Sequence, residues 1–238
     1  MKVEKRKNNK KKYLALLLAL FVCAGGTMAW LTSESELKNQ FTIGQITPVD
    51  PDENAPGGDD EKPIPNEDKK DPTKLNGNLY EPSWDEDNAK IYPDATIAKD
   101  PYVGIGPKSE ASYVYIYVGN HMNNVYFYIG EEWEAVSGNA YDAVEGTYTG
   151  GLFRYKEILN PSDEKNVWTN TPLFQNVIAS SDASYKDLTG TETGATQEAA
   201  ANSIDVKAYV HQAKDGKGQS IDRVVVDAAA KKAFGIGQ

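Results

Sequence analysis

The chain has 238 residues, of which 25 are basic and 35 acidic, so its formal net charge is −10. This length is enough for one substantial domain with accessory segments. The acidic balance disfavours nucleic acid and anionic membrane surfaces as partners, because both are themselves negatively charged. The single cysteine, Cys23, lies near the N-terminus, which excludes disulfides and thiolate metal sites from the rest of the chain.

The first 29 residues have the pattern of a cleavable export signal. Residues 2–12 carry seven basic side chains and one acidic, an apolar run follows over 14–24, and small residues then lead to Ala29. The apolar run is shorter than the roughly 20 residues that a stable membrane-spanning helix needs. We therefore expect cleavage between Ala29 and Trp30, with Thr27 and Ala29 in the peptidase cleft. The exported chain would carry 18 basic and 34 acidic residues, a net charge of −16.

The exported chain would begin with a polar segment, residues 30–46, that ends in a short strand. Phe41-Thr42-Ile43-Gly44-Gln45-Ile46 alternates apolar and polar residues, which is the period of a half-buried strand. The apolar side chains of this strand would be those of Phe41, Ile43 and Ile46.

Residues 47–78 are rich in proline and acidic side chains. Six prolines fall between Pro48 and Pro72, and the acids crowd between Asp50 and Asp71. Such a segment buries too little apolar surface to offset its chain entropy, so we expect a disordered or extended linker. Residues 50–61 imitate a calcium loop, but Ala55 stands where the sharp turn requires glycine, so we favour an acidic linker and leave calcium binding open.

From residue 79 to 238 the composition indicates an all-β domain. Tyr, Val, Ile and Thr are frequent, and turn residues such as Gly138-Asn139 and Gly150-Gly151 recur at short intervals. Many short strands separated in this way predict an antiparallel β-sandwich with minor helices, which we place at 195–202 and 224–234. The predicted strands are Tyr102–Ile105, Ser112–Val118, Val125–Ile129, Leu152–Ile158, Pro172–Ile178 and Ser203–His211.

Several of these segments resemble one family of exported proteins. Gly25-Gly26-Thr27-Met28-Ala29, then Trp30-Leu31-Thr32 and Asn39-Gln40-Phe41-Thr42-Ile43-Gly44, look like the junction of the TasA/camelysin-like proteins of Gram-positive bacteria, which a SipW-type signal peptidase processes. Residues 92–101, 111–116 and 204–212 resemble later blocks, with Asp94 where glycine is more usual. The resemblance implies a jelly-roll-like sandwich, an extracellular location and, for the best-known members, assembly into biofilm matrix fibres.

The sequence offers little support for catalysis. The camelysin branch has been classed as metallopeptidase, but zinc hydrolysis needs three protein ligands and an open position for water. The only histidines are His121 and His211, and neither a His-Glu-x-x-His motif nor a Ser-His-Asp pairing is evident. We therefore expect no enzymatic activity, no cofactor and no metal site, and keep a metallopeptidase as the least favoured reading.

The aromatic residues of one predicted strand suggest a binding face. Tyr113, Tyr115 and Tyr117 point to one side of the strand, and aliphatic residues point to the other. A tyrosine face could stack on sugars or on another subunit, because tyrosine offers a flat apolar area with a polar tip. The alternative is a strand that is covered on both faces.

The function we expect is that of a secreted structural protein of the cell surface or biofilm matrix. The strand that contains Phe41, Ile43 and Ile46 would add to a sheet edge, its own or a neighbour's, through main-chain hydrogen bonds. Expected partners are the protein itself or other matrix proteins, with the signal peptidase during export and membrane contact only through the leader. An extracellular adhesin that binds polysaccharide through the tyrosine face is the second hypothesis.

Overall fold

The fold is known from a computed structural model, which describes residues 40–41, 46–51, 54–57, 62–189 and 202–237. The predicted cleavage residues Thr27, Ala29 and Trp30 lie outside this set, as does Ile43 and nearly all of the helix predicted at 195–202. Within the described residues, no helix combines the length and the apolar character needed to cross a membrane.

The largest element is an eight-stranded sheet that is antiparallel apart from the pairing of its first strand. Its strands are β1 (Gln40–Phe41), β14 (Ile204–Gln212), β8 (Ser112–Asn120), β11 (Thr147–Tyr155), β9 (Val125–Tyr128), β13 (Asn176–Ala179) and β6 (Thr96–Ala98), in that order, with β10 (Trp133–Asp142) paired to β11. The pair β1 and β14 is parallel.

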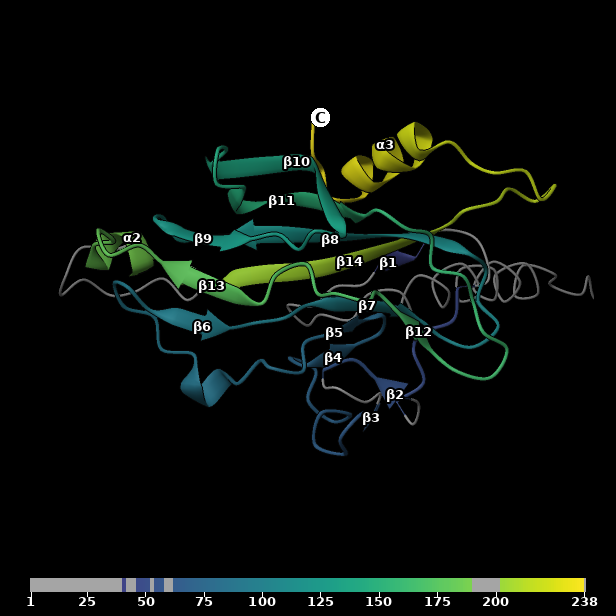
Figure 1. Cartoon of the computed structure of the whole chain (residues 1–238), viewed down its shortest axis with the longest axis horizontal. Coiled ribbons are helices and arrows are strands. Elements are labelled where there is room, and N and C mark those ends of the chain that lie inside the picture. Colours follow the sequence, from purple (N-terminus) through teal and green to yellow (C-terminus); the bar gives the residue numbers. More distant parts are fainter. Residues whose placement is uncertain (1–39, 42–45, 52–53, 58–61, 190–201, 238) are drawn as a thin grey trace, which may run out of the picture. The chain divides into compact units, whose positions relative to one another are not determined.

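A second, four-stranded sheet packs against one face of the first. Its strands, in order, are β12 (Val167–Trp168), β7 (Tyr102–Ile105), β5 (Leu79–Tyr80) and β4 (Leu75–Asn76), and a separate pair is formed by β2 (Asn54–Ala55) and β3 (Lys62–Pro63). The helical segments are η1 (Glu86–Asn88), α2 (Tyr185–Thr189) and α3 (Arg223–Ala233). Helix α3 lies on the opposite side of the large sheet from the four-stranded sheet (Figure 1).

One continuous apolar core joins the two sheets. Val114 and Ile116 of β8 belong to the same buried cluster as Leu79 of β5 and Val103 and Ile105 of β7, and none of the five is exposed to solvent. Each such side chain contributes about 1.5–3 kcal/mol by leaving water. The prediction of an all-β antiparallel sandwich is confirmed.

Two glycines that we interpreted as a turn lie inside β11. The first residues of β11, Thr147 and Tyr148, pair with β9, whereas Gly151–Arg154 pair with β8. Gly151 adopts a φ of 127°, and a Cβ there would lie 2.2 Å from the carbonyl oxygen of Ser137. The glycine therefore permits a bend at which β11 passes from one partner strand to the next.

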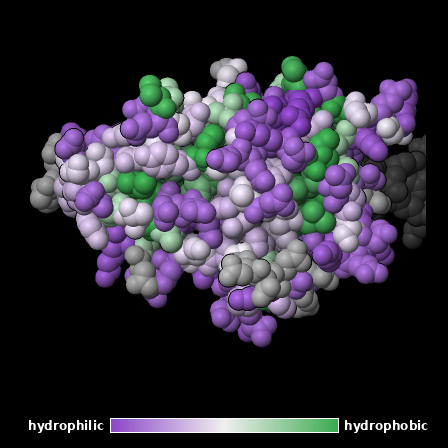
Figure 2. Space-filling view, viewed as in Figure 1, coloured by the Kyte–Doolittle hydropathy of each residue, from purple (hydrophilic) through white to green (hydrophobic). Residues whose placement is uncertain are grey.

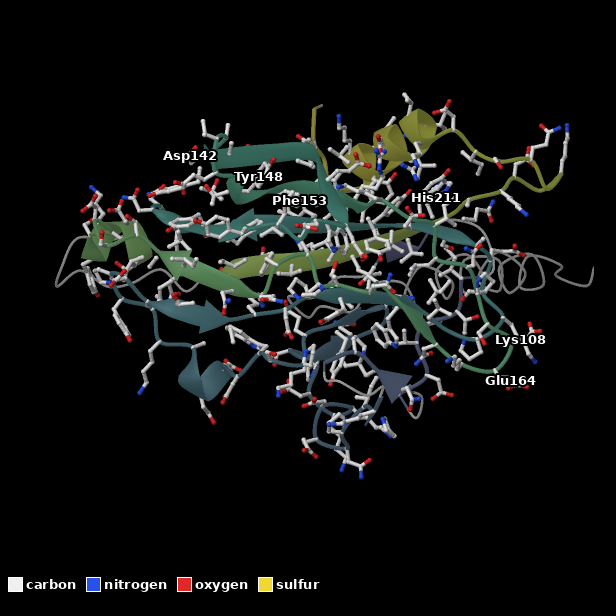
Figure 3. All side chains as sticks on the ribbon, in the orientation of Figure 1. Lys108, Asp142, Tyr148, Phe153, Glu164 and His211 are labelled. Carbon is white, nitrogen blue, oxygen red and sulfur yellow. The ribbon has the colours of Figure 1, made fainter. Side chains whose placement is uncertain are left out.

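The bend also changes which side chains face the core. Tyr148 and Phe153 of β11 are an odd number of residues apart, yet their rings meet edge to face with centroids 5.3 Å apart (Figure 3). A regular strand would place them on opposite faces. Leu152, next to Phe153, packs instead into the cluster under α3.

The described part of residues 47–78 is packed structure rather than the flexible linker that we expected. Val49, Ala55 and Ile64 are at most 5% exposed, and the indole N–H of Trp168 donates to the carbonyl oxygen of Asn54 over 2.8 Å. Proline and acidic residues dominate the composition, but the few apolar side chains form a small cluster with Tyr80. That cluster ties the segment to the four-stranded sheet.

The face of the molecule drawn in Figure 2 is mainly hydrophilic, with separate hydrophobic patches. This agrees with the acidic composition of the chain. Large exposed apolar side chains include Val144, between β10 and β11, and the adjacent Val224 and Val225 of α3, which are 96%, 73% and 59% exposed.

Candidate functional site

We call residues 30–46 the arm. Its residues Gln40 and Phe41 form β1, at one edge of the large sheet. The backbone of β1 lies parallel to β14, with Gln40 opposite Tyr209 and Phe41 opposite Val210 (Figure 1). Ile46 is partly buried against the main core. The structure thus places the backbone of Gln40 and Phe41 next to the protein's own sheet, while the roles of Phe41, Ile43 and Ile46 in association remain a prediction.

The chain is fastened immediately after the arm. The Thr47 N–H donates to the Ser109 hydroxyl oxygen over 2.9 Å, and the Gly106 N–H donates to the Thr47 carbonyl oxygen over 2.8 Å. Two further bonds of 2.8 Å join the backbone of Asp50 to the side-chain amide of Asn166. These hydrogen bonds hold the backbone of Thr47 and Asp50 to the domain.

The predicted tyrosine face is covered by α3 and is not an open binding surface. Tyr113 and Tyr115 are 5% and 0% exposed, and the Tyr117 ring stacks on Phe234 with centroids 5.0 Å apart. Val226 and Ala230 of α3 pack into the same cluster. The strand is therefore covered on both faces, and the hypothesis that this face holds a glycan loses its structural basis.

A charged network fastens α3 to the sheet. Arg154 of β11 donates from Nη1 to both carboxylate oxygens of Asp227 on α3 at 2.6 Å, and from Nε and Nη2 to Glu134 of β10 at 2.9 and 2.6 Å. The Tyr115 hydroxyl also donates to Asp227, over 2.9 Å. Burial raises the pKa of Tyr115, and the hydrogen bond to Asp227 raises it further. The network is a structural clamp, since each of its charges is paired.

The two histidines take part in separate contacts. His121 Nε2 lies 3.3 Å from a carboxylate oxygen of Asp205, and His211, on β14 (Figure 3), lies with Nδ1 2.7 Å from the Gln212 carbonyl oxygen. Across the part of the chain that the structure describes, no three His, Cys, Asp or Glu side chains are grouped as a metal would require.

Glu81 and Lys99 form a buried ion pair that no local sequence pattern predicts. Glu81 follows β5 and is 0% exposed, Lys99 follows β6 and is 6% exposed, and Nζ lies 2.8 Å from Oε2. The Lys99 ammonium also sits 4.2 Å from the centroid of the Trp84 ring, a cation–π contact. Burial raises the pKa of Glu81, although the charge of Lys99 and its hydrogen bond oppose that rise.

The carboxylate of Glu81 in this ion pair does not have all of its hydrogen bonds. Oε1 of Glu81 is buried and has no hydrogen-bond partner among the residues that the structure describes. Asp100, next to Lys99, is engaged elsewhere, because its two carboxylate oxygens accept from the N–H and the hydroxyl of Ser83 at 2.7 Å each. Buried polar atoms nearly always have a partner, so an unpartnered carboxylate oxygen is the chemically unusual feature of this region.

Comparison of the chain with protein-family models, with curated proteins and with solved structures finds no match in any of the three.

Proposed function

We propose that the chain is an exported structural protein of the bacterial cell surface or extracellular matrix, whose subunits associate by adding the arm, residues 30–46, to β14 of a neighbour. The observation that carries the proposal is the pairing of β1 with β14. A segment that pairs with its own sheet edge can make the same bonds to the equivalent edge of another copy. The leader, with its basic, apolar and small segments, supports the export of the chain.

The receiving edge is long enough to bind an added strand. All nine residues of β14 pair with β8 on one side, and β1 lies on the other side. Nine residues of strand extend about 30 Å. Without the arm, β14 would be the edge strand of the sheet, and such an edge is a template for pairing with another chain.

The arm is also long enough to reach a neighbour. Thr47 and Asp50 are held by the hydrogen bonds described above, so an arm that changed its partner would leave the domain before residue 47. Its 17 residues extend up to about 55 Å when fully stretched. This exceeds the length of β14, so the same arm can serve its own subunit or the next one.

Removing the arm tests the proposal. The protein that begins at Trp30 should form filaments in negative-stain micrographs as its concentration rises, and a version that begins at Thr47 should not. An excess of a synthetic peptide of residues 30–46, added to the longer protein, should occupy β14 and suppress its filaments. Filaments of the same kind from the shortened protein, or none from the longer one, would contradict the proposal.

A crosslink identifies which subunit receives the arm. Phe41 and Val210 are opposite each other, and the only native cysteine lies in the leader, so Phe41→Cys with Val210→Cys forms a unique pair in the exported chain. Oxidised filaments should give a ladder of oligomers on a gel without reductant. Filaments whose chains all migrate as monomers would show that each arm pairs with β14 of its own subunit, which would contradict the proposal.

A further inference from the structure

A cavity of about 510 Å³ lies beside the Glu81–Lys99 pair. Its lining includes apolar residues of β6, β13 and β14, together with Trp84, Ile91 and the ion pair. The strand residues that line it are Ile97, Val177, Ile204 and Val206. This volume is within the range of about 300–1,000 Å³ that small-molecule sites occupy.

The polar residues that line the cavity are Thr73, Glu81, Glu86, Lys99, Asn202 and Ser203. Among them Glu81 is fully buried, and its Oε1 has no hydrogen-bond partner within the described part of the chain. Lys99 Nζ has three protons to donate and is placed between Oε2 of Glu81 and the face of Trp84. A site with an apolar wall and one or two unfilled polar positions has the usual composition of a ligand pocket.

We propose that this cavity binds an uncharged, mainly apolar small molecule that carries an O–H or N–H group. The donor of the ligand would bind Oε1 of Glu81, and its apolar body would lie between Trp84 and the strand residues. An uncharged ligand fits because Glu81 and Lys99 already neutralise each other, so that a charged ligand would leave an unbalanced charge in a buried place. The inference does not depend on the proposed role of the arm.

The test compares two probes that differ in one hydrogen-bond donor. 2-Naphthol has an O–H group, whereas 2-methoxynaphthalene has the same ring system and no donor. Titration calorimetry with the purified exported protein should show that 2-naphthol binds at least about tenfold more tightly, the factor that a hydrogen bond to a charged group typically provides. Equal affinities, or no binding of 2-naphthol up to its solubility limit, would overturn the proposal.

Variants locate the binding. Ile204→Trp should fill the cavity and abolish 2-naphthol binding, whereas the equally large change Val225→Trp, at an exposed position of α3, should leave it unchanged. Replacing both members of the ion pair, Glu81→Leu with Lys99→Met, should keep the protein folded and make the two probes bind equally. Unchanged binding by the Ile204→Trp protein, or a retained preference in the double variant, would place the probe elsewhere and contradict the proposal.

Discussion

The sandwich places partly or fully buried charge in two regions that differ in how completely the charge is satisfied. Beneath α3, Arg154 donates to Asp227 and Glu134, and Asp227 also accepts from Tyr115. Beside the cavity, Lys99 pairs with one oxygen of Glu81 and leaves the other without a partner. The first arrangement holds the helix to the sheet, whereas the second leaves an acceptor that the ligand we propose would fill.

The pKa values of the charged groups also differ between the two regions. Desolvation lowers the pKa of Arg154, but the hydrogen bonds and charges of Glu134 and Asp227 outweigh it, so that the pKa lies above its ordinary value. For Glu81, burial outweighs the single lysine, and its pKa is raised. The charged form is therefore favoured in the network under α3 and disfavoured beside the cavity.

The largest expected effect is that of removing one member of the ion pair. Lys99→Met leaves Glu81 buried without its partner, and the free energy of unfolding should fall by about 3–5 kcal/mol. Urea denaturation at neutral pH measures the change. The control is the double variant Glu81→Leu with Lys99→Met, which should be close to the wild type or more stable, because no charge is left unpaired. A single variant as stable as the double one would show that the pair is not truly buried.

A smaller loss should follow from opening the network under α3. Asp227→Ala removes the partner of Arg154 Nη1 and of the Tyr115 hydroxyl, and should cost about 2 kcal/mol. Hydrogen exchange should accelerate in α3 more than in β8. Uniform acceleration over the whole domain would mean that the helix is not a separately fastened unit.

The next effect isolates one hydrogen bond of that network. Tyr115→Phe removes the donor to Asp227, which keeps its two bonds from Arg154, so the expected cost is about 1 kcal/mol. Thermal unfolding is the measurement, with Tyr113→Phe as the matched control, because its hydroxyl donates over a longer 3.2 Å to the Ile221 carbonyl oxygen. A larger loss for the control would reverse the importance that we assign to the two tyrosines.

The last effect is a dependence on pH. Since the pKa of Glu81 is raised in the folded protein, the folded state holds a proton that the unfolded chain has already lost above the ordinary value of 4.5. The contribution of Glu81 to stability should therefore be fully present below about that pH and be lost as the pH rises through the folded pKa. Urea midpoints measured at a series of pH values should show a shallower decline for Glu81→Gln than for the wild type. Parallel pH profiles would contradict the raised pKa.

The parts of the fold that could be predicted are those with strong alternation. Strand β7 was predicted with its observed ends, and β8 and β14 differ by one or two residues, because Val, Ile and Tyr alternate there between clear turn signals. The helix predicted over 224–234 is α3, which begins at Arg223 after its N-cap, Asp222. These segments carry their own pattern and depend little on distant contacts.

The parts that were missed depend on tertiary contacts. Strand β10 contains Gly138 and Asn139, which we took for a turn, but a Cβ at Gly138 would lie 2.8 Å from the Tyr148 ring, so the glycine allows a neighbouring strand to pack closely. Glu81 and Lys99 stand 18 residues apart in segments that do not pair with each other. No local pattern predicts such a meeting, and only the folded sandwich brings the two side chains together.

The burial of β14 on both of its faces decides how an assembly built on it could extend. Val206, Ala208 and Val210 belong to the core between the sheets, and Tyr209 lies beneath the C-terminal helix. A second subunit could not stack above or below this strand without unfolding a layer, so the association that we propose would be confined to the edge that β1 occupies. Growth along one line, from one subunit to the next, produces an unbranched thread rather than a layered aggregate.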